Sequence, residues 1–178
     1  MKQKLINVYK FNELKKDVKE KVLNSFRENN DYSFLNDTLI YKLGELLKKY
    51  KIEAVDLNLM YSLGYCQGDG LSFTGTYKWK EHTIFISRSG NYYHKHSTDI
   101  YFKELGEEYD EDELTELVNE KIVETREKEF KEIYYKICDE IEKEGYKEIE
   151  DEDSEETIKE IIKMNGYTFR ETGEMENL

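Results

Sequence analysis

The sequence predicts an α+β fold, in which an antiparallel sheet of about four strands packs with helices at both ends of the chain. Apolar residues recur at three- and four-residue steps before residue 50 and again after residue 110, which is typical of amphipathic helices. Between these regions they alternate at every second residue, as in half-buried strands. Four of the ten glycines lie at the centre of this alternating region, at Gly64, Gly68, Gly70 and Gly75.

Two amphipathic helices are expected in the first 50 residues. The first is indicated by apolar residues at steps of four: Leu14, Val18, Val22 and Phe26. Asn12 is its expected N-cap, and the helix ends near residues 29–30. The second helix is expected over residues 33–50, where Gly44 indicates close packing.

A meander of four strands is expected next. The strands cover residues 55–62, 71–79, 83–88 and 92–102. The turns fall at residues 67–70, 81–82 and 89–91, and Gly68, Asp69 and Gly70 supply positive φ angles in the first turn. Gly64 and Gly75 indicate a bulge or a close backbone approach.

A long acidic helix is expected from about residue 110 to Gly145, either continuous or broken near residues 124–125. Residues 146–150 are expected to be extended. A capping box of Asp153 and Glu156 begins a short last helix that ends near Met164, before Gly166. The sequence then predicts a strand at residues 167–169, a turn at 172–173 and a frayed end over 174–178.

A single domain is expected, with a helix–helix–sheet core in residues 1–103 and an acidic helical region in residues 104–178 that packs on the core or projects from it. Residues 1–103 carry 17 Lys/Arg and 12 Asp/Glu, whereas residues 104–178 carry 10 and 28. The balance is therefore +5 in the first part and −18 in the second. The acidic part is either solvated helix surface or a negative field for a basic partner.

The turn Gln67-Gly68-Asp69-Gly70 first suggests a phosphate cradle, but neither a helix N-terminus nor a P-loop lysine follows it. Two interpretations stay open. Asp69 either holds the backbone of its own hairpin, or the turn presents Gln67 and Asp69 to a partner.

Two histidines, His94 and His96, would share one face of a strand and could form a metal site with Asp69, Asp99 or His82. That site would support a small hydrolase or a nucleotide-acting enzyme. The alternative is two polar side chains on a strand face. Cys66 is a candidate nucleophile only if a histidine lies beside it, and is otherwise a small packing residue. No coherent catalytic set is predicted, and no cofactor or metal is expected.

The sheet region is rich in aromatic residues, including Tyr92, Tyr93 and Trp79. These side chains are core, a protein interface, or a platform on which single-stranded nucleic acid stacks. The platform would use four neighbouring cations: Lys78, Lys80, Arg88 and Lys95. The net charge of −13 disfavours direct nucleic-acid binding.

Four short motifs follow one another along nearly the whole chain. They are Phe11-Asn-Glu-Leu, Tyr65-Cys-Gln-Gly-Asp-Gly-Leu-Ser-Phe-Thr-Gly75, Tyr92-Tyr-His-Lys-His-Ser97 and Asn165-Gly-Tyr-Thr-Phe169. Together they resemble a family of small tailed-phage and prophage proteins that share a Ser/Cys-Gln-Gly-Asp-Gly-x-Ser-Phe core. The resemblance implies an accessory protein that works in the bacterial cytoplasm. It implies no catalytic residue.

The widely separated Cys66 and Cys138 indicate no disulfide framework, and no run approaches the ~20 apolar residues of a membrane span. We therefore expect a cytoplasmic protein that binds a host protein, most concretely as an inhibitor of a defence nuclease such as a CRISPR effector. The candidate contact residues are Gln67, Asp69, Tyr92, Tyr93, Glu107, Glu108, Asp110, Glu111 and Asp112. The oligomeric state is not predicted.

Overall fold

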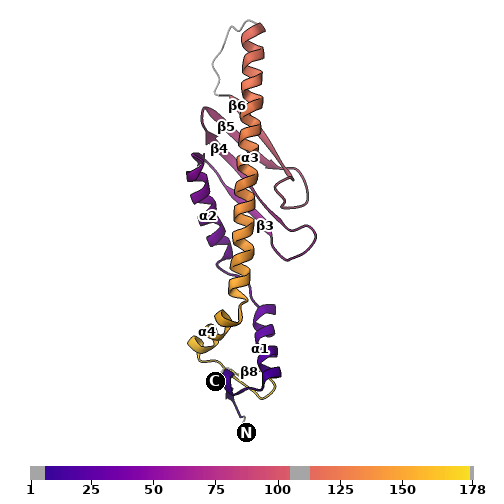
Figure 1. The fold of residues 1–178 in the computed structure, drawn as a ribbon, viewed down its shortest axis with the longest axis vertical. Helices are drawn as coiled ribbons and strands as arrows, with labels where there is room; N and C mark the ends of the chain where they lie inside the picture. Colours follow the sequence, from indigo (N-terminus) through magenta and orange to yellow (C-terminus); the bar gives the residue numbers. More distant parts are fainter. Residues whose placement is uncertain (1–6, 105–112, 177–178) are drawn as a thin grey trace, which may run out of the picture. The chain divides into compact units, whose positions relative to one another are not determined.

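A computed structural model describes residues 7–104 and 113–176, with side chains described except at residues 104 and 113–122. The α+β prediction is confirmed (Figure 1). The chain forms two compact units. Met1–Ser33 and Lys147–Leu178 make a terminal unit, and Phe34–Tyr146 make a central unit.

The terminal unit combines the two ends of the chain. Its elements are β1 (Tyr9–Lys10), the 3-10 turn η1 (Phe11–Glu13), α1 (Lys16–Glu28), α4 (Glu155–Asn165), β7 (Thr168–Phe169) and β8 (Met175–Glu176). The strands form an antiparallel sheet in the order β1-β7-β8. The apolar faces of α1 and α4 meet the edge-to-face pair of Phe11 and Phe169 in one core.

Local hydrogen bonds shift the expected ends of these helices. Asn12 is not an N-cap, because Glu13 folds back to accept a hydrogen bond from Lys10 N at 2.7 Å and residues 11–13 form η1. The N-cap of α4 is Ser154, whose Oγ accepts from Thr157 N at 3.1 Å, and not Asp153. Residues 175–176, expected to fray, pair with β7 as β8.

The central unit contains the meander. Its elements are α2 (Leu35–Lys49), β2 (Ile52–Ala54), β3 (Asn58–Ser62), β4 (Gly70–Trp79), β5 (His82–Arg88) and β6 (Thr98–Glu104), followed by α3 (Glu113–Glu152), which continues into the terminal unit. The sheet order is β2-β4-β5-β6, and β3 pairs with the first half of β4. As the alternation predicts, every second residue of β4 from Leu71 on, Gly75 excepted, is buried.

A bulge at Val55 and Asp56 separates β2 from β3, so the first expected strand, residues 55–62, begins only at Asn58, and β2 lies before it. Val55 N and Asp56 N both donate to Thr76 O, at 2.8 and 3.3 Å, while Asp56 Oδ1 accepts from Thr76 N at 2.5 Å. Gly75 lies against this bulge with φ of 133°. Val55, expected on the buried face, is 57% exposed.

The later strands begin at other residues than expected. The β4–β5 turn lies at residues 80–81, where Lys80 has φ of 53°, so His82 is already the first residue of β5. The fourth strand, β6, begins at Thr98, and residues 89–97 form a loop. Tyr92 to Ser97 are therefore not part of a strand.

Helix α3 is continuous over 40 residues, without a break at 124–125 and without a stop at Gly145. A Cβ at Gly145 would lie 3.4 Å from Leu39 Cδ2 and would overlap Leu63 Cδ1, so this glycine permits close packing. Residues 146–150 are helical rather than extended. None of the helices in the described ranges carries an apolar stretch that could cross a membrane.

Helix α3 crosses one face of the sheet (Figure 1), and aromatic side chains pack between the helix and the sheet. Phe130 packs against Trp79 with ring centroids 5.3 Å apart. The fully buried Tyr134 lies 4.6 Å from the ring of Phe73, and its hydroxyl bonds Phe73 O at 3.1 Å and Phe73 N at 3.4 Å. The tyrosine hydroxyl therefore satisfies two backbone groups in the core.

Carboxylates of α3 pair with lysines from the first part of the chain. Glu129 binds Lys80 at 2.7 Å, Asp139 binds Lys95, and two further pairs link α3 to α2: Glu140 with Lys49 and Glu144 with Lys42. Within the central unit, lysines of residues 1–103 thus neutralise part of the negative charge of residues 104–178.

Gly75→Ala is expected to destabilise the protein by roughly 2–4 kcal/mol, because its Cβ would lie 2.5 Å from Asp56 O in a left-handed conformation. Gly44→Ala is the matched control. The close packing expected at Gly44 is absent, since no described atom lies within 4 Å of a Cβ there. That alanine should stabilise α2 by about 0.5–1 kcal/mol. Urea denaturation followed by circular dichroism measures both, and a Gly75→Ala protein as stable as wild type would contradict this account.

Candidate functional site

Two loops meet at one end of the central sheet: residues 63–69, between β3 and β4, and residues 89–97, between β5 and β6. Gly68 has φ of 117°, and a Cβ on it would lie 3.2 Å from Tyr92 Cε1. A Cβ on Gly70 would lie 3.0 Å from His94 Cα. Both glycines are therefore needed for the loops to touch, although only Gly68, and neither Asp69 nor Gly70, supplies the expected positive φ.

Asp69 organises the loop of residues 63–69. Its Oδ1 accepts from Ser62 Oγ at 3.1 Å and Cys66 Sγ at 3.2 Å. Its Oδ2 accepts from Cys66 N at 3.1 Å and from the hydroxyl of Tyr146, on α3, at 2.8 Å. The ring of Tyr65, at φ of 56°, packs 4.9 Å from that of Tyr146. Asp69 thus holds its own hairpin and ties it to α3.

The hydrogen bonds fix the protonation states of this network. Burial opposes ionisation of Asp69, but the bonds from Tyr146, Cys66 and Gly64 outweigh it and hold the pKa of the carboxyl well below its ordinary value. The hydrogen bond to Asp69, with the charge of that carboxylate, raises the pKa of the Cys66 thiol. Cys66 is therefore a thiol at neutral pH, which is the wrong state for a nucleophile.

The loop of residues 89–97 is held by its own hydrogen bonds. Ser89 N donates to Ser97 O at 2.8 Å, which closes the base of the loop. Arg88 donates to Gly90 O at 2.6 Å and Asn91 O at 2.7 Å, and its guanidinium lies 4.9 Å from the ring centroid of Tyr93. Lys95, within the loop, pairs with Asp139 of α3. The loop is thus fixed to both β5 and α3.

The two candidate histidines stack on each other in this loop rather than on a strand. Their ring centroids are 4.8 Å apart, and His96 N donates to His94 Nδ1 at 3.2 Å. His96 also lies 4.7 Å from the ring of Tyr135. Desolvation, with the charges of His94 and Lys95, lowers the pKa of His96. His94 lines the same pocket as Asp69, whose two oxygens already accept the bonds given above.

The third histidine lies elsewhere. His82 is buried at the start of β5 and pairs with Trp79, at the far end of β4 from Gly70. Within residues 7–104 and 113–176, no three His, Cys, Asp or Glu side chains form a group that could hold a metal ion. The geometry thus gives no support to the hydrolase that the sequence leaves open at Asp69, His94 and His96.

An open pocket of about 650 Å³ lies where the loops meet. It is lined by Gln67, Gly68, Asp69, Tyr92, His94 and Ser97. Around it, Tyr65 is 64%, Tyr92 62% and Tyr93 36% exposed. We call this set of residues, Tyr65 to Asp69 with Tyr92 to Ser97, the loop-pair surface.

The loop-pair surface unites four of the predicted contact residues: Gln67, Asp69, Tyr92 and Tyr93. The other five predicted contact residues lie outside the described residues: Glu107, Glu108, Asp110, Glu111 and Asp112. Two residues of α3 that support the loops, Tyr135 and Tyr146, were not predicted from the sequence. These tyrosines lie three turns apart on one helix face, at ~3.6 residues per turn, and that spacing is the signal for them.

The cations proposed for a nucleic-acid platform have other partners. Lys78 pairs with Glu53 at 3.5 Å, Lys80 with Glu129 at 2.7 Å, and Lys95 with Asp139. Trp79, which would have to stack on a base, is 3% exposed. Trp79 is therefore not available to stack on a base, whereas Tyr93 is exposed, with the guanidinium of Arg88 over its ring.

Comparisons with protein-family models, with curated proteins and with solved structures found no match for this chain. The function is therefore inferred from the geometry of the site. That geometry offers exposed tyrosines on two fixed loops and a carboxylate that is fully engaged in hydrogen bonds.

Alkylation tests the state of Cys66. The exposed Cys66 should react with iodoacetamide more slowly than free cysteine at pH 8, because the bond to Asp69 keeps its proton in place. Asp69→Asn should accelerate the reaction, while the buried Cys138 stays unreactive in both proteins. Mass spectrometry of the two cysteine peptides gives the rates. A wild-type Cys66 that reacts as fast as the variant would overturn this assignment.

Asp69→Asn is also expected to lower stability by about 1–3 kcal/mol at pH 7, because the loop loses hydrogen bonds to a charged acceptor. The folded-state pKa of Asp69 is depressed, so its contribution is present above the ordinary value of 3.8 and is lost as the pH falls below it. Urea midpoints of wild type and variant should differ most at pH 5–7 and converge in acid. Tyr146→Phe, which removes one donor, should show part of the effect.

Proposed function

We propose that this protein acts by stoichiometric binding of another protein through the loop-pair surface, without catalysing a reaction. The observation that carries the proposal is the exposure of Tyr65, Tyr92 and Tyr93 on two loops that hydrogen bonds hold in place. Rigid tyrosines lose little conformational entropy on binding and are enriched at interface hot spots. A loop fixed before binding also avoids the free-energy cost of ordering.

The chemistry of the pocket supports recognition rather than catalysis. Gln67 is exposed and offers both a donor and an acceptor at the rim. Asp69 is ionised but already accepts hydrogen bonds on both oxygens, so it is a fixed negative charge rather than a general base. The thiol of Cys66 keeps its proton. We therefore assign Gln67 and the tyrosines to partner contact and Asp69 to holding the surface.

The partner class that we propose is a bacterial defence nuclease, including a CRISPR effector, met in the host cytoplasm. The net charge of −13 supports a partner with a basic surface, such as a nucleic-acid channel. The phage resemblance of the Gln67-Gly68-Asp69-Gly70 segment points to the same setting. In this proposal the acidic residues steer association, and the loop-pair surface provides the contact.

The test is capture from a susceptible bacterial host by the tagged full chain, followed by a cleavage assay with the captured nuclease. Gln67→Ala and Tyr92→Ala should each weaken the complex about tenfold or more, as loss of a hot spot does. Tyr41→Ala is the matched control, because Tyr41 is 70% exposed on α2, outside the loop-pair surface. Circular dichroism checks that each variant is folded.

Two results would remove the proposal. Capture and inhibition that are unchanged in the Tyr65→Ala, Gln67→Ala and Tyr92→Ala proteins would exclude the loop-pair surface. A chain that captures no nuclease, and leaves DNA and RNA cleavage by the host's defence systems intact, would exclude the partner class.

A further inference from the structure

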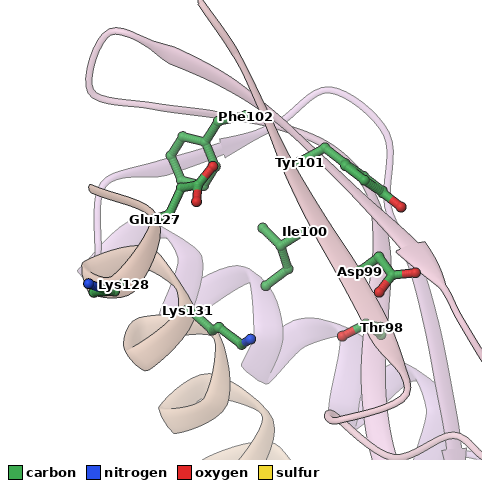
Figure 2. Close-up of a pocket in the computed structure, with 8 residues that line it drawn as sticks. All are labelled: Thr98, Asp99, Ile100, Tyr101, Phe102, Glu127, Lys128 and Lys131. Carbon is green, nitrogen blue, oxygen red and sulfur yellow. The ribbon is translucent and has the colours of Figure 1, made fainter. Parts of the chain in front are cut away.

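A second concave feature lies at another edge of the central sheet. A groove of about 340 Å³ separates β6 from α3 (Figure 2). Five successive residues of β6, Thr98 to Phe102, form one wall. Glu127, Lys128 and Lys131 form the other wall, on one side of α3. None of these residues belongs to the loop-pair surface.

The lining shows that the groove follows the edge of β6. Successive side chains of a strand point to opposite faces of the sheet. In Figure 2, Ile100 and Phe102 are directed to the helix side, whereas Asp99 and Tyr101 are directed away from it. The groove is lined by side chains from both faces of the sheet. It therefore runs along the backbone edge of β6 rather than over one face of the sheet.

That edge is open to pairing in the described part of the chain. β6 is the last strand in the order β2-β4-β5-β6, and its seven residues pair with β5 alone. A strand pairs through backbone groups on both of its edges, so an unpaired edge is a template for an added strand. Tyr101, 55% exposed, and the apolar Ile100 offer side-chain contacts to such a strand.

The charged side chains that line the groove indicate the kind of segment that binds there. The lysines of the sheet and of α2 that face α3, such as Lys80 and Lys49, pair with carboxylates of the helix. Lys128 and Lys131 form no ion pair with any described residue. The lining carboxylates are Asp99, which points away from the helix, and Glu127. The helix wall therefore presents two ammonium groups and one carboxylate, with the ammonium of Lys131 5.9 Å from the ring centroid of Tyr135, and its net charge of +1 favours a carboxylate in the groove.

We infer that the groove between β6 and α3 is a docking site for an extended, acidic segment of a partner protein, which adds to the sheet beside β6 and places carboxylates against Lys128 and Lys131. A second copy of this chain is a poorer occupant. A symmetric β6–β6 contact would bring the same lysine pair from both copies to one interface. The inference does not depend on the function proposed above.

The experiment uses the full chain labelled with nitrogen-15 and a short peptide that alternates valine with glutamate. Two matched peptides serve as controls, one with glutamine in place of glutamate and one methylated at alternate backbone nitrogens. The first peptide should cause saturable shifts in the amides of Thr98 to Phe102 and should protect from hydrogen exchange those amides of the segment that point away from β5. The glutamine peptide should bind about tenfold more weakly or worse, and the methylated peptide should not bind.

Charge-reversing variants locate the site. Lys131→Glu, and the double variant with Lys128→Glu, should abolish binding of the glutamate peptide, because both side chains are exposed and line the groove. Lys136→Glu is the control, since Lys136 is exposed on α3 and does not line the groove. Tyr92→Ala should leave peptide binding unchanged, which separates this site from the loop-pair surface.

Three outcomes would overturn the inference. The first is that millimolar glutamate peptide causes no chemical-shift change in the amides of β6. Equal binding of the methylated peptide, which would show contact without strand pairing, is another. The third is a concentration-dependent dimer, seen by sedimentation, that Lys131→Glu alters, because this result would assign the edge to a second copy.

Discussion

The hydroxyl of Tyr134 holds α3 to the sheet through the backbone of Phe73, and the arrangement of the central unit depends on this contact. The register of β4 with β5 ends at Gly75, so the preceding residues of β4 pair with β3 alone. A buried amide and carbonyl left without partners there would cost about 1–3 kcal/mol each. Tyr134 bonds both groups of Phe73, which allows β5 to leave β4 and its loop to turn toward residues 63–69.

The helices and strands that bury one face could be predicted from the sequence, because such burial makes apolar residues recur at a fixed spacing. The stripe of α2 and the alternation of β4 are examples, and both are buried as predicted. Single interactions were not readable. The Asp56 bonds that produce the bulge leave no periodic trace, and Gly145 resembles a helix stop. In α3 the cost of that glycine, about 1 kcal/mol, is offset by close packing against Leu39 and Leu63.

Several residues of the candidate site were predicted from the sequence, but their arrangement was not. The sequence singled out Gln67, Asp69, Tyr92 and His94, but it could not show that Gly68 and Gly70 bring the two loops into contact. Residues 92–97 have the aromatic composition of a strand, yet the hydrogen bonds of Arg88 and Ser97 close them into a loop. Tyr146 lies far along the chain from Asp69. Its role follows from the fold of α3 rather than from any local motif.

The pairing of β1 with β7 sets an order for biosynthesis. Tyr9 lies opposite Phe169, so β1 has no strand partner until Phe169 has been synthesised. The ribosome releases all of Phe34–Tyr146 before it releases β7, and that unit can assemble while the N-terminal segment waits. The apolar face of α1 meanwhile lacks α4 and stays in contact with solvent. β1 and β8 flank β7 in one small sheet, so a short peptide leading from β8 into β1 would convert the late, long-range pairing of β1 with β7 into a local one.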